Sequence, residues 1–228
     1  MEVVKGDVQE SVGSLQVCAG QAGGCEAAIH AMLTMYEEEE TNAVLLIDAA
    51  NAFNSINRKV MLRNIERICP IAFTYAYNCY SPHARLFVIG GKEIRSMEGT
   101  TQGDPPSMAF YAIGLLPLIW CISQSSKSLQ ASNDAQTSPD PQVSNNHAKQ
   151  VAYADDLTGA GKLVKLRKWF DDIIQNGPSF GYNAEPSKSW LIVKQSKLAE
   201  AKRIFDGTGV EITTAGKKCG CCNWHNGI

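Results

Sequence analysis

The run Val-Leu-Leu-Ile-Asp at residues 44–48 places the strongest constraint on how this chain can fold. Four consecutive apolar residues with no polar residue between them are typical of a β-strand that is buried on both faces. The carboxylate that follows them lies where such a strand ends. The sequence therefore predicts a buried strand with Asp48 at its mouth.

The rest of the chain alternates helical and strand patterns. Apolar spacing predicts helices over residues 25–36, 58–69, 105–122, 162–176 and 197–206. Strands are predicted at 189–194 and in two hairpins, one over 84–97 with Gly90-Gly91 at its turn and one over 151–159. Residues 1–15 are polar and are expected to be loosely ordered. This order predicts an α+β fold, in which a small antiparallel sheet has helices packed on one face.

Four residues are predicted to begin or end these helices. Asn57 is expected to cap the helix that follows it, and Pro70 to stop that helix. Asp104 is expected to cap the helix that begins at Pro105, because Pro is favoured in a first turn. Gly177 is a natural C-cap for the helix before it.

Composition narrows the class of protein. The 228 residues are 44% hydrophobic and 19% charged, which is typical of a globular chain and not of a disordered one. The longest apolar run, residues 108–122, is shorter than the roughly 18 residues of a membrane span, so we expect a buried helix and no membrane partner. The net charge of −2 is unlike that of a dedicated nucleic-acid binder, which is usually basic. The N-terminus lacks the pattern of a secretory signal, which predicts an intracellular protein of the nucleus or the cytoplasm.

Two acidic positions carry the chemistry that the residues by themselves indicate. Asp48 ends the buried strand, and Asp155 and Asp156 lie at the tip of the second predicted hairpin. Three close carboxylates repel one another unless a cation neutralises them, and hard oxygen ligands suit Mg²⁺. Two such ions about 4 Å apart stabilise the attacking and leaving oxygens of a phosphoryl displacement. By itself, an Asp-Asp pair is more often an ordinary turn, because Asp is a favoured turn residue.

Four segments give these acids a context, and we call them the first to fourth motif segments. They are LLIDAANAFNSINR at residues 45–58, EGTTQGDPPSMAFYA at 98–112, VAYADDLTGAGK at 151–162 and GYNAEPSKSWLIVK at 181–194. In this order and spacing they resemble the palm motifs of reverse transcriptases, the RNA-directed DNA polymerases, and specifically those of retrotransposons. The resemblance covers about residues 15–214.

The resemblance implies an enzyme that transfers a nucleotide from a dNTP to a primer 3′-hydroxyl, with an RNA template, a DNA primer and dNTP as its partners. Asp48 and Asp155 would bridge two Mg²⁺ ions, which Mn²⁺ could replace, and Asp156 would be a more peripheral ligand. The backbone carbonyl of Ala49 would complete the shell of one metal. Lys188 would face the pyrophosphate leaving group and protonate it; the alternative is an exposed lysine in a turn.

Further residues are implied to contact the nucleotide or the template. Phe53 would lie beneath the incoming sugar, where a ring excludes a 2′-hydroxyl; the alternative is a core residue. Gln102 would contact the templating pair and Gly103 would allow close approach of the backbone, the alternative being a plain turn before a helix. Tyr153 would also contact nucleotide or template. Pro106 stands where the family usually has an apolar residue such as Leu, and it removes one more backbone donor.

The resemblance is to one part of a reverse transcriptase. Residues 16–30 resemble the last piece of the fingers, whereas the earlier basic strands and the later thumb have no counterpart. We expect partial fingers over residues 1–47, a palm over 48–214 with a polar insertion or linker at 123–149, and a Cys-rich tail over 215–228. The chain is thus expected to be a fragment of a retrotransposon polyprotein, whose missing fingers and thumb segments lie in the parent.

Two other functions would use the same residues. A catalytically inactive remnant that only binds nucleic acid would account for the missing fingers and thumb. An unrelated metal-dependent phosphoryl-transfer enzyme would use the same acids, but it would leave Phe53 and the Gln-Gly-Asp-Pro sequence unexplained.

Overall fold

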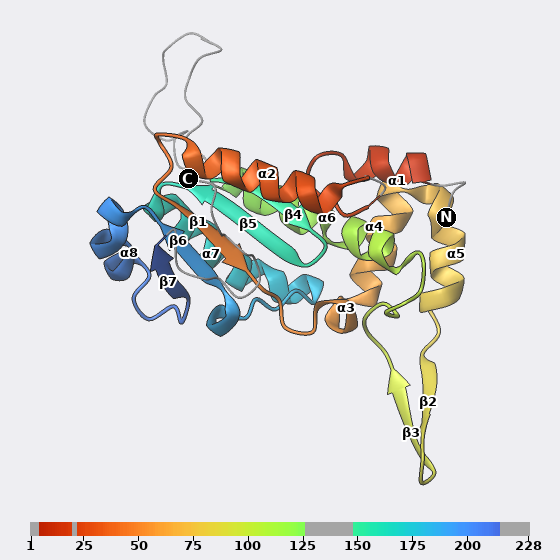
Figure 1. The fold of residues 1–228 in the computed structure, drawn as a ribbon. Helices are drawn as coiled ribbons and strands as arrows, with labels where there is room; N and C mark the ends of the chain where they lie inside the picture. The colour runs from red at the N-terminus through yellow and green to blue at the C-terminus, as the bar shows by residue number, and fades with distance from the viewer. Residues whose placement is uncertain (1–4, 20–21, 126–147, 215–228) are drawn as a thin grey trace, which may run out of the picture.

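A five-stranded sheet lies at the centre of the protein. The computed structural model describes residues 5–19, 22–125 and 148–214 (Figure 1). The strands are β1 (Ala43–Ile47), β4 (Lys149–Tyr153), β5 (Asp156–Gly161), β6 (Trp190–Val193) and β7 (Glu211–Thr214), in the order β4-β5-β1-β6-β7. β1 pairs antiparallel with β5 and β6, and β7 runs parallel to β6. The predicted α+β class with a small, mainly antiparallel sheet is confirmed.

Helices surround this sheet. Their bounds are α1 (Lys5–Val12), α2 (Gly24–Glu37), α3 (Ala52–Ser55), α4 (Arg58–Ile68), α5 (Pro70–Tyr80), α6 (Ser107–Ser125), α7 (Leu163–Phe180) and α8 (Leu198–Ile204), with 3-10 turns η2 (Pro186–Lys188) and η3 (Gln195–Lys197). A separate hairpin of β2 (Ala84–Val88) and β3 (Lys92–Ser96) projects from the body (Figure 1).

The central strand β1 is covered on both faces. Ala43, Leu45 and Ile47 belong to the main core, which α6 and α7 also form. Val44 points to the other face and packs in a second cluster with α2. Figure 1 shows α2 crossing one side of the sheet, with α6 and α7 behind it. The expectation of helices on one face is therefore wrong in this detail, because apolar side chains on both faces of a strand require two covering layers.

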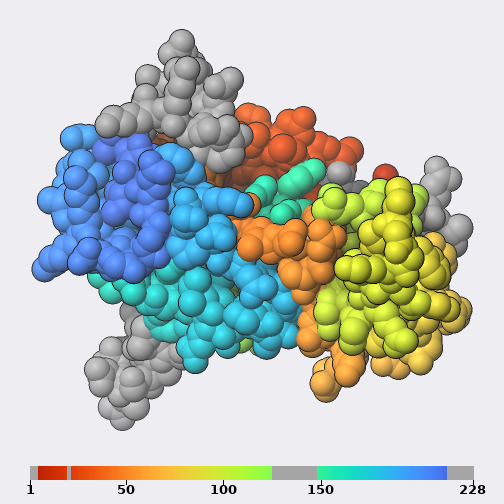
Figure 2. All heavy atoms as spheres, turned by 90° about the horizontal axis from the view of Figure 1, so that it is seen from below, coloured from red at the N-terminus to blue at the C-terminus, as the bar shows by residue number. Residues whose placement is uncertain are grey.

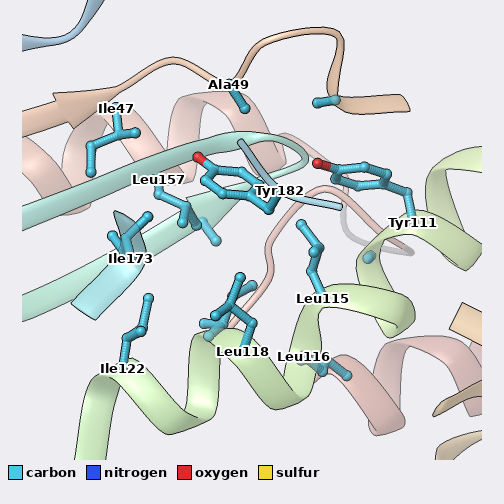
Figure 3. Packing of buried hydrophobic residues seen from close by; sticks show 14 of the residues in the cluster. Ile47, Ala49, Tyr111, Leu115, Leu116, Leu118, Ile122, Leu157, Ile173 and Tyr182 are labelled. Atoms are coloured by element: carbon cyan, nitrogen blue, oxygen red, sulfur yellow. The ribbon is translucent and has the colours of Figure 1, made fainter. Parts of the chain in front are cut away.

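The helix α6 forms much of the main core. Among the residues that the structure describes, it is the one helix long and apolar enough to cross a membrane, over Ser107–Gln124, yet 67% of that window is buried inside the protein. Figure 3 shows Leu115, Leu118 and Ile122 of this helix pointing toward the sheet. All three side chains are almost fully buried. The predicted buried helix is confirmed.

Two helices lie where the sequence predicted none. α1 occupies residues expected to be loosely ordered, and it buries Val8 and Val12, one turn apart, in the main core. α5 begins at Pro70, which ends α4 as predicted but also starts the next helix. Proline suits that place because its missing N–H has no partner in a first helical turn.

Of the predicted helix starts, one is confirmed and one is wrong. Asn57 caps α4, since its Oδ1 accepts a hydrogen bond of 3.1 Å from the N–H of Val60. α6 begins only at Ser107, so Asp104 is not its cap. The Asp104 carboxylate instead accepts a hydrogen bond of 2.7 Å from the hydroxyl of Tyr80.

The helix α7 ends at Gly181, and the prediction of Gly177 as its C-cap is wrong. Gly181 has a φ of 77°, in the left-handed region that favours glycine. A Cβ atom here would lie 2.0 Å from the carbonyl oxygen of Ser55. Only glycine lets the end of α7 approach the first motif segment this closely.

Some predictions fall on residues outside the described ranges. These include the Cys-rich tail at 215–228 and most of the polar stretch predicted at 123–149, whose ends belong to α6 and β4. The division of the chain into partial fingers over residues 1–47 and a palm over 48–214 stays a prediction. The strand β1 belongs to the first of these ranges, yet it pairs with strands from the second.

Candidate active site

The four motif segments meet at one end of the sheet. The N–H of Thr100, in the second segment, donates a hydrogen bond of 2.6 Å to the carbonyl of Phe53, in the first. The N–H of Glu185, in the fourth, donates one of 2.8 Å to the carbonyl of Asp48. The third segment joins them through the pairing of β5 with β1. Figure 2 shows atoms near residue 50, in orange, between the turquoise β4–β5 region and the blue chain of the 180s.

Asp48 directly follows the last residue of β1, and Asp156 is the first residue of the neighbouring strand β5. The last pair of the β1–β5 ladder is Ile47 with Leu157, so the two acids lie directly at the end of this ladder. They are near enough to interact, because the charge of Asp48 affects the pKa of both Asp155 and Asp156. Asp155 lies in the turn between β4 and β5, directly before Asp156. The structure therefore brings together the three carboxylates that the sequence singled out.

The three carboxyl groups are close enough to affect one another's ionisation. Removal of solvent by the surrounding protein, together with the charges of Asp155 and Asp48, raises the pKa of Asp156 to about 6. Burial raises the pKa of Asp155, and the charge of Asp48 adds to this rise. The raised pKa values mean that the surrounding protein favours the neutral form of both groups, but Asp155 is only half-buried and Asp156 is exposed, so solvent screens part of this effect. A bound cation would supply the positive charge that their ionised forms lack.

The donor atoms fit a divalent cation that prefers oxygen. Three carboxylates lie at this end of the sheet, and Ala49 adds a backbone carbonyl in the same segment. Within the described ranges, no group of three or more His, Cys, Asp or Glu side chains is arranged to hold an ion by itself. Mg²⁺ commonly takes one or two carboxylates and completes its shell with waters and substrate phosphates. The site offers that partial shell.

The turn of the third motif segment is held from two sides by distant side chains. Gln16 Nε2 donates a hydrogen bond of 2.9 Å to the carbonyl of Ala154. Gln16 Oε1 accepts a hydrogen bond of 2.8 Å from the N–H of the same residue. The hydroxyl of Tyr182 donates 2.8 Å to the carbonyl of Asp155. Neither residue has a role that the sequence predicts. The one local feature that distinguishes Gln16 is that it is a single polar residue within the short sequence Leu-Gln-Val-Cys.

Phe53 rests on a tyrosine from the second motif segment. Its ring stacks on that of Tyr111, with centroids 4.5 Å apart and planes 23° apart. Phe53 is half-buried, so one part of it packs in the core while another reaches solvent. Figure 3 shows the rings of Tyr111 and Tyr182 in one layer, between α6 and the segment that carries Ala49. The buried hydroxyl of Tyr111 has no hydrogen-bond partner in the described part of the chain.

The other predicted contact residues differ in their surroundings. Gln102 and Gly103 are exposed, and Gly103, with a φ of 87°, has open space where a Cβ would lie. Pro106 is buried, and its carbonyl accepts the N–H of Phe110 at 2.9 Å, so it fits the start of α6 despite its missing donor. Tyr153 packs against the cluster under α2.

Lys188 lies on η2, in the fourth motif segment. The residue is exposed, and in the part of the chain that the structure describes its ammonium group has no ion pair. Its backbone N–H donates a hydrogen bond of 3.0 Å to the carbonyl of Glu185. The N–H of Glu185 in turn donates to the carbonyl of Asp48. These surroundings agree with the alternative prediction, which is an exposed lysine in a turn.

Solved structures share this fold, although no protein-family model and no curated protein matches the sequence. Telomerase from Candida tropicalis matches with a TM-score of 0.57 at 12% identity, over 86% of this chain and 37% of that one. The same telomerase truncated from its C-terminal domain gives 0.58 at 13% identity, over 85% and 40%. The fold is reverse-transcriptase-like. Telomerase from Candida albicans, in complex with a TWJ fragment of telomeric RNA, gives 0.56 at 11% identity, over 85% and 35%.

The likeness to these telomerases is one of fold. At 11–13% identity it does not carry over their activity. The chain also spans less than half the length of each of them, so the comparison covers only a portion of each larger protein.

Proposed function

We propose that this chain is the palm of an RNA-directed DNA polymerase of retrotransposon type. The observation that carries the proposal is the meeting of Asp48 with Asp155 and Asp156 at one end of a reverse-transcriptase-like sheet. The Candida albicans telomerase was solved with a fragment of telomeric RNA, which supports an RNA partner for a chain of this fold. The remaining partners would be a DNA primer and a dNTP.

The reaction adds one nucleotide to the 3′ end of the primer. The primer 3′-oxygen forms a bond to the α-phosphorus of the dNTP, the bond from that phosphorus to the pyrophosphate oxygen breaks, and the 3′-hydroxyl loses its proton to water. Two Mg²⁺ ions, when bound, stabilise the charge on the attacking and leaving oxygens. Asp48 and Asp155 would hold them, with the carbonyl of Ala49 and the carboxylate of Asp156 beside them.

The neighbouring residues would position the substrates. The ring of Phe53, fixed by its stack on Tyr111, would lie beneath the incoming sugar and exclude a ribonucleotide. Gln102 and Gly103 are exposed and lie shortly after Thr100, whose N–H is hydrogen-bonded to the carbonyl of Phe53. From this position they would contact the templating base pair. Lys188 would donate a proton to the departing pyrophosphate, for which its ammonium must reach the triphosphate.

A single-addition assay tests the proposed reaction. The full chain is incubated with Mg²⁺, dideoxy-TTP and an oligo(dT) primer annealed to poly(rA), and the primer is weighed by mass spectrometry. We expect the primer to gain one dideoxythymidylate while one pyrophosphate is released. Asp155→Asn should reduce the yield by at least about a hundredfold, because a metal ligand is lost. Asp171→Asn, an exposed carboxylate on α7, is the matched control. Product that persists in Asp155→Asn would contradict the proposal.

A second candidate function is the binding of nucleic acid without chemistry. It is favoured by the raised pKa values of Asp155 and Asp156, because groups that favour their neutral form bind a cation less readily. Binding of an RNA–DNA duplex that weakens with salt, without any primer extension, would support it.

A further inference from the structure

We propose that Gln16 is a positioning residue, which fixes the turn at Ala154 so that the Asp155 carboxylate is presented to a divalent cation. The inference rests on the proposed function, and it concerns a residue that lies 138 positions before the turn it contacts. It goes beyond the motif segments, because Gln16 precedes all four of them.

The side-chain amide of Gln16 is buried and bonds at both ends to one residue. Gln16 has no exposed surface. Its amide N–H donates to the carbonyl of Ala154 and its amide oxygen accepts from the N–H of the same residue. Gln16 itself forms an isolated parallel bridge to Ala152 of β4, and the N–H of Val17 donates a hydrogen bond of 2.9 Å to the carbonyl of Ala152. The backbone at residues 16–17 is therefore attached to β4, and the amide of Gln16 reaches the turn that follows this strand.

The turn needs such a partner because of its backbone conformation. Ala154 has a φ of 56°, which residues other than glycine rarely adopt. It is also nearly buried, so without Gln16 its carbonyl would lose this partner and its N–H would be left with the thiol of Cys18. A peptide released from this conformation would rotate the next residue, which is Asp155.

Asp155 is consequently held on both sides. Gln16 fixes the residue before it, and the hydroxyl of Tyr182 fixes its carbonyl through a hydrogen bond of 2.8 Å. The carboxylate itself remains half-buried at the end of the sheet. Partners that orient a metal ligand in this way commonly change metal affinity about 10–100-fold when they are removed.

A second glutamine, Gln150, provides a control that distinguishes a positioning role of Gln16 from a purely structural one. Gln150 on β4 also uses both ends of its amide, donating 2.8 Å to the carbonyl of Ile119 and accepting 2.8 Å from Nε1 of Trp169. These bonds join β4 to α6 and α7, away from the turn. Gln150→Met therefore removes the same kind of amide as Gln16→Met without touching Asp155.

The test measures Mn²⁺ binding to the full chain, without nucleotide or nucleic acid, from the free Mn²⁺ signal in electron paramagnetic resonance. We expect Asp155→Asn to lose tight Mn²⁺ binding and Gln16→Met to weaken it about tenfold. Gln150→Met should bind as the wild type does, even where it lowers the melting temperature as much. If Gln16→Met does not fold, Gln16→Asn is measured instead, because its shorter amide cannot reach both groups and should weaken binding in the same direction.

Two outcomes separate this inference from the proposed function. Wild-type Mn²⁺ affinity in Gln16→Met, with weak binding in Asp155→Asn, would overturn the positioning role and leave the metal site intact. Unchanged affinity in Asp155→Asn would overturn the metal site itself and the inference with it.

A rescue variant tests whether Gln16 acts through the conformation of Ala154. Glycine adopts a positive φ without strain, so Ala154→Gly should hold the turn when the glutamine is absent. We expect the double variant Gln16→Met/Ala154→Gly to regain most of the Mn²⁺ affinity that Gln16→Met loses. A double variant that binds no better than Gln16→Met would contradict this route of action.

Discussion

The carbonyl of Asp48 accepts a 2.8 Å hydrogen bond from the N–H of Glu185, which fixes the end of β1 to the fourth motif segment. The N–H of Asp48 donates, at 3.4 Å, to the hydroxyl of Ser189. Both backbone groups of Asp48 are therefore held by one segment, and the strand that it follows, β1, lies between β5 and β6 in the sheet. The carboxylate owes its position to residues that follow it by more than a hundred positions.

Two buried tyrosines are expected to respond in opposite ways to loss of a hydroxyl. Tyr182→Phe should lower the free energy of unfolding by about 1–3 kcal/mol, because the carbonyl of Asp155 loses its partner. Tyr111→Phe should leave it unchanged or raise it, because within the described residues the Tyr111 hydroxyl bonds to nothing. Urea unfolding of both variants compares the two hydroxyls directly. Equal losses in the two variants would contradict these hydrogen-bond assignments.

Gly181 is expected to tolerate no side chain. Gly181→Ala should cost more than about 3 kcal/mol or prevent folding, because its Cβ would overlap the carbonyl of Ser55. Gly207→Ala is the matched control, since Gly207 has a similar φ of 71° but nothing within 4 Å of a Cβ. It should cost only the conformational strain of about 1–2 kcal/mol. Chemical denaturation measures both, and a Gly181→Ala variant no less stable than the control would contradict the close approach.

Ionisation of Asp156 is expected to destabilise the folded chain when no cation is bound. Its pKa rises from 3.8 to about 6 on folding, so its contribution to stability is full below the lower value and is lost as the pH rises through 6. Asp156→Asn should therefore be more stable than the wild type at pH 7.5 by about 1 kcal/mol, since solvent screens part of the effect. The difference should disappear near pH 4. Melting temperatures in metal-free buffer across this range provide the measurement, and a difference that grew toward low pH would have the wrong sign.

The ring of Phe53 is expected to select the sugar of the incoming nucleotide. Phe53→Val should raise incorporation of UTP relative to dTTP about tenfold, or about 1.4 kcal/mol, because a 2′-hydroxyl no longer meets the ring. Phe53→Tyr keeps the ring and its stack on Tyr111, so its selectivity should stay with the wild type. Selectivity that does not change in Phe53→Val would assign the residue to the core alone.

The central part of the fold could be predicted because its signals are local. The apolar run of β1 identifies a strand that is buried on both faces, and Gly90-Gly91 identifies the turn of the β2–β3 hairpin. Asn57 caps α4 through an atom three residues from its partner. Each of these features depends on neighbours in the sequence, so the residues themselves contain the information.

The features that the sequence does not predict depend on contacts between distant segments. α1 has only Val8 and Val12 to bury, and its helix is stabilised by packing in a core that the sequence does not display. Gly177 offered the nearest glycine for a C-cap, but the chain continues until Gly181 meets the carbonyl of Ser55.

The candidate active site likewise combines features that the sequence predicts with contacts that it does not predict. The proximity of Asp48 to Asp155 and Asp156 could be predicted from the resemblance of the four motif segments, whereas the acids by themselves fit an ordinary turn equally well. The hydrogen bonds of Gln16 and Tyr182 could not be foreseen, since no local pattern relates these side chains to the turn they hold.

The most direct test of the central claim is the initial rate of dTTP incorporation on oligo(dT)-primed poly(rA) with Mg²⁺. The wild type is measured beside Asp48→Asn, Asp155→Asn and the control Asp171→Asn, with the folding of each verified by its melting temperature. The two carboxylates should be required together, so both site variants should lose incorporation while Asp171→Asn keeps the wild-type rate. Incorporation by the wild type that survives in either site variant would show that these carboxylates do not carry the chemistry.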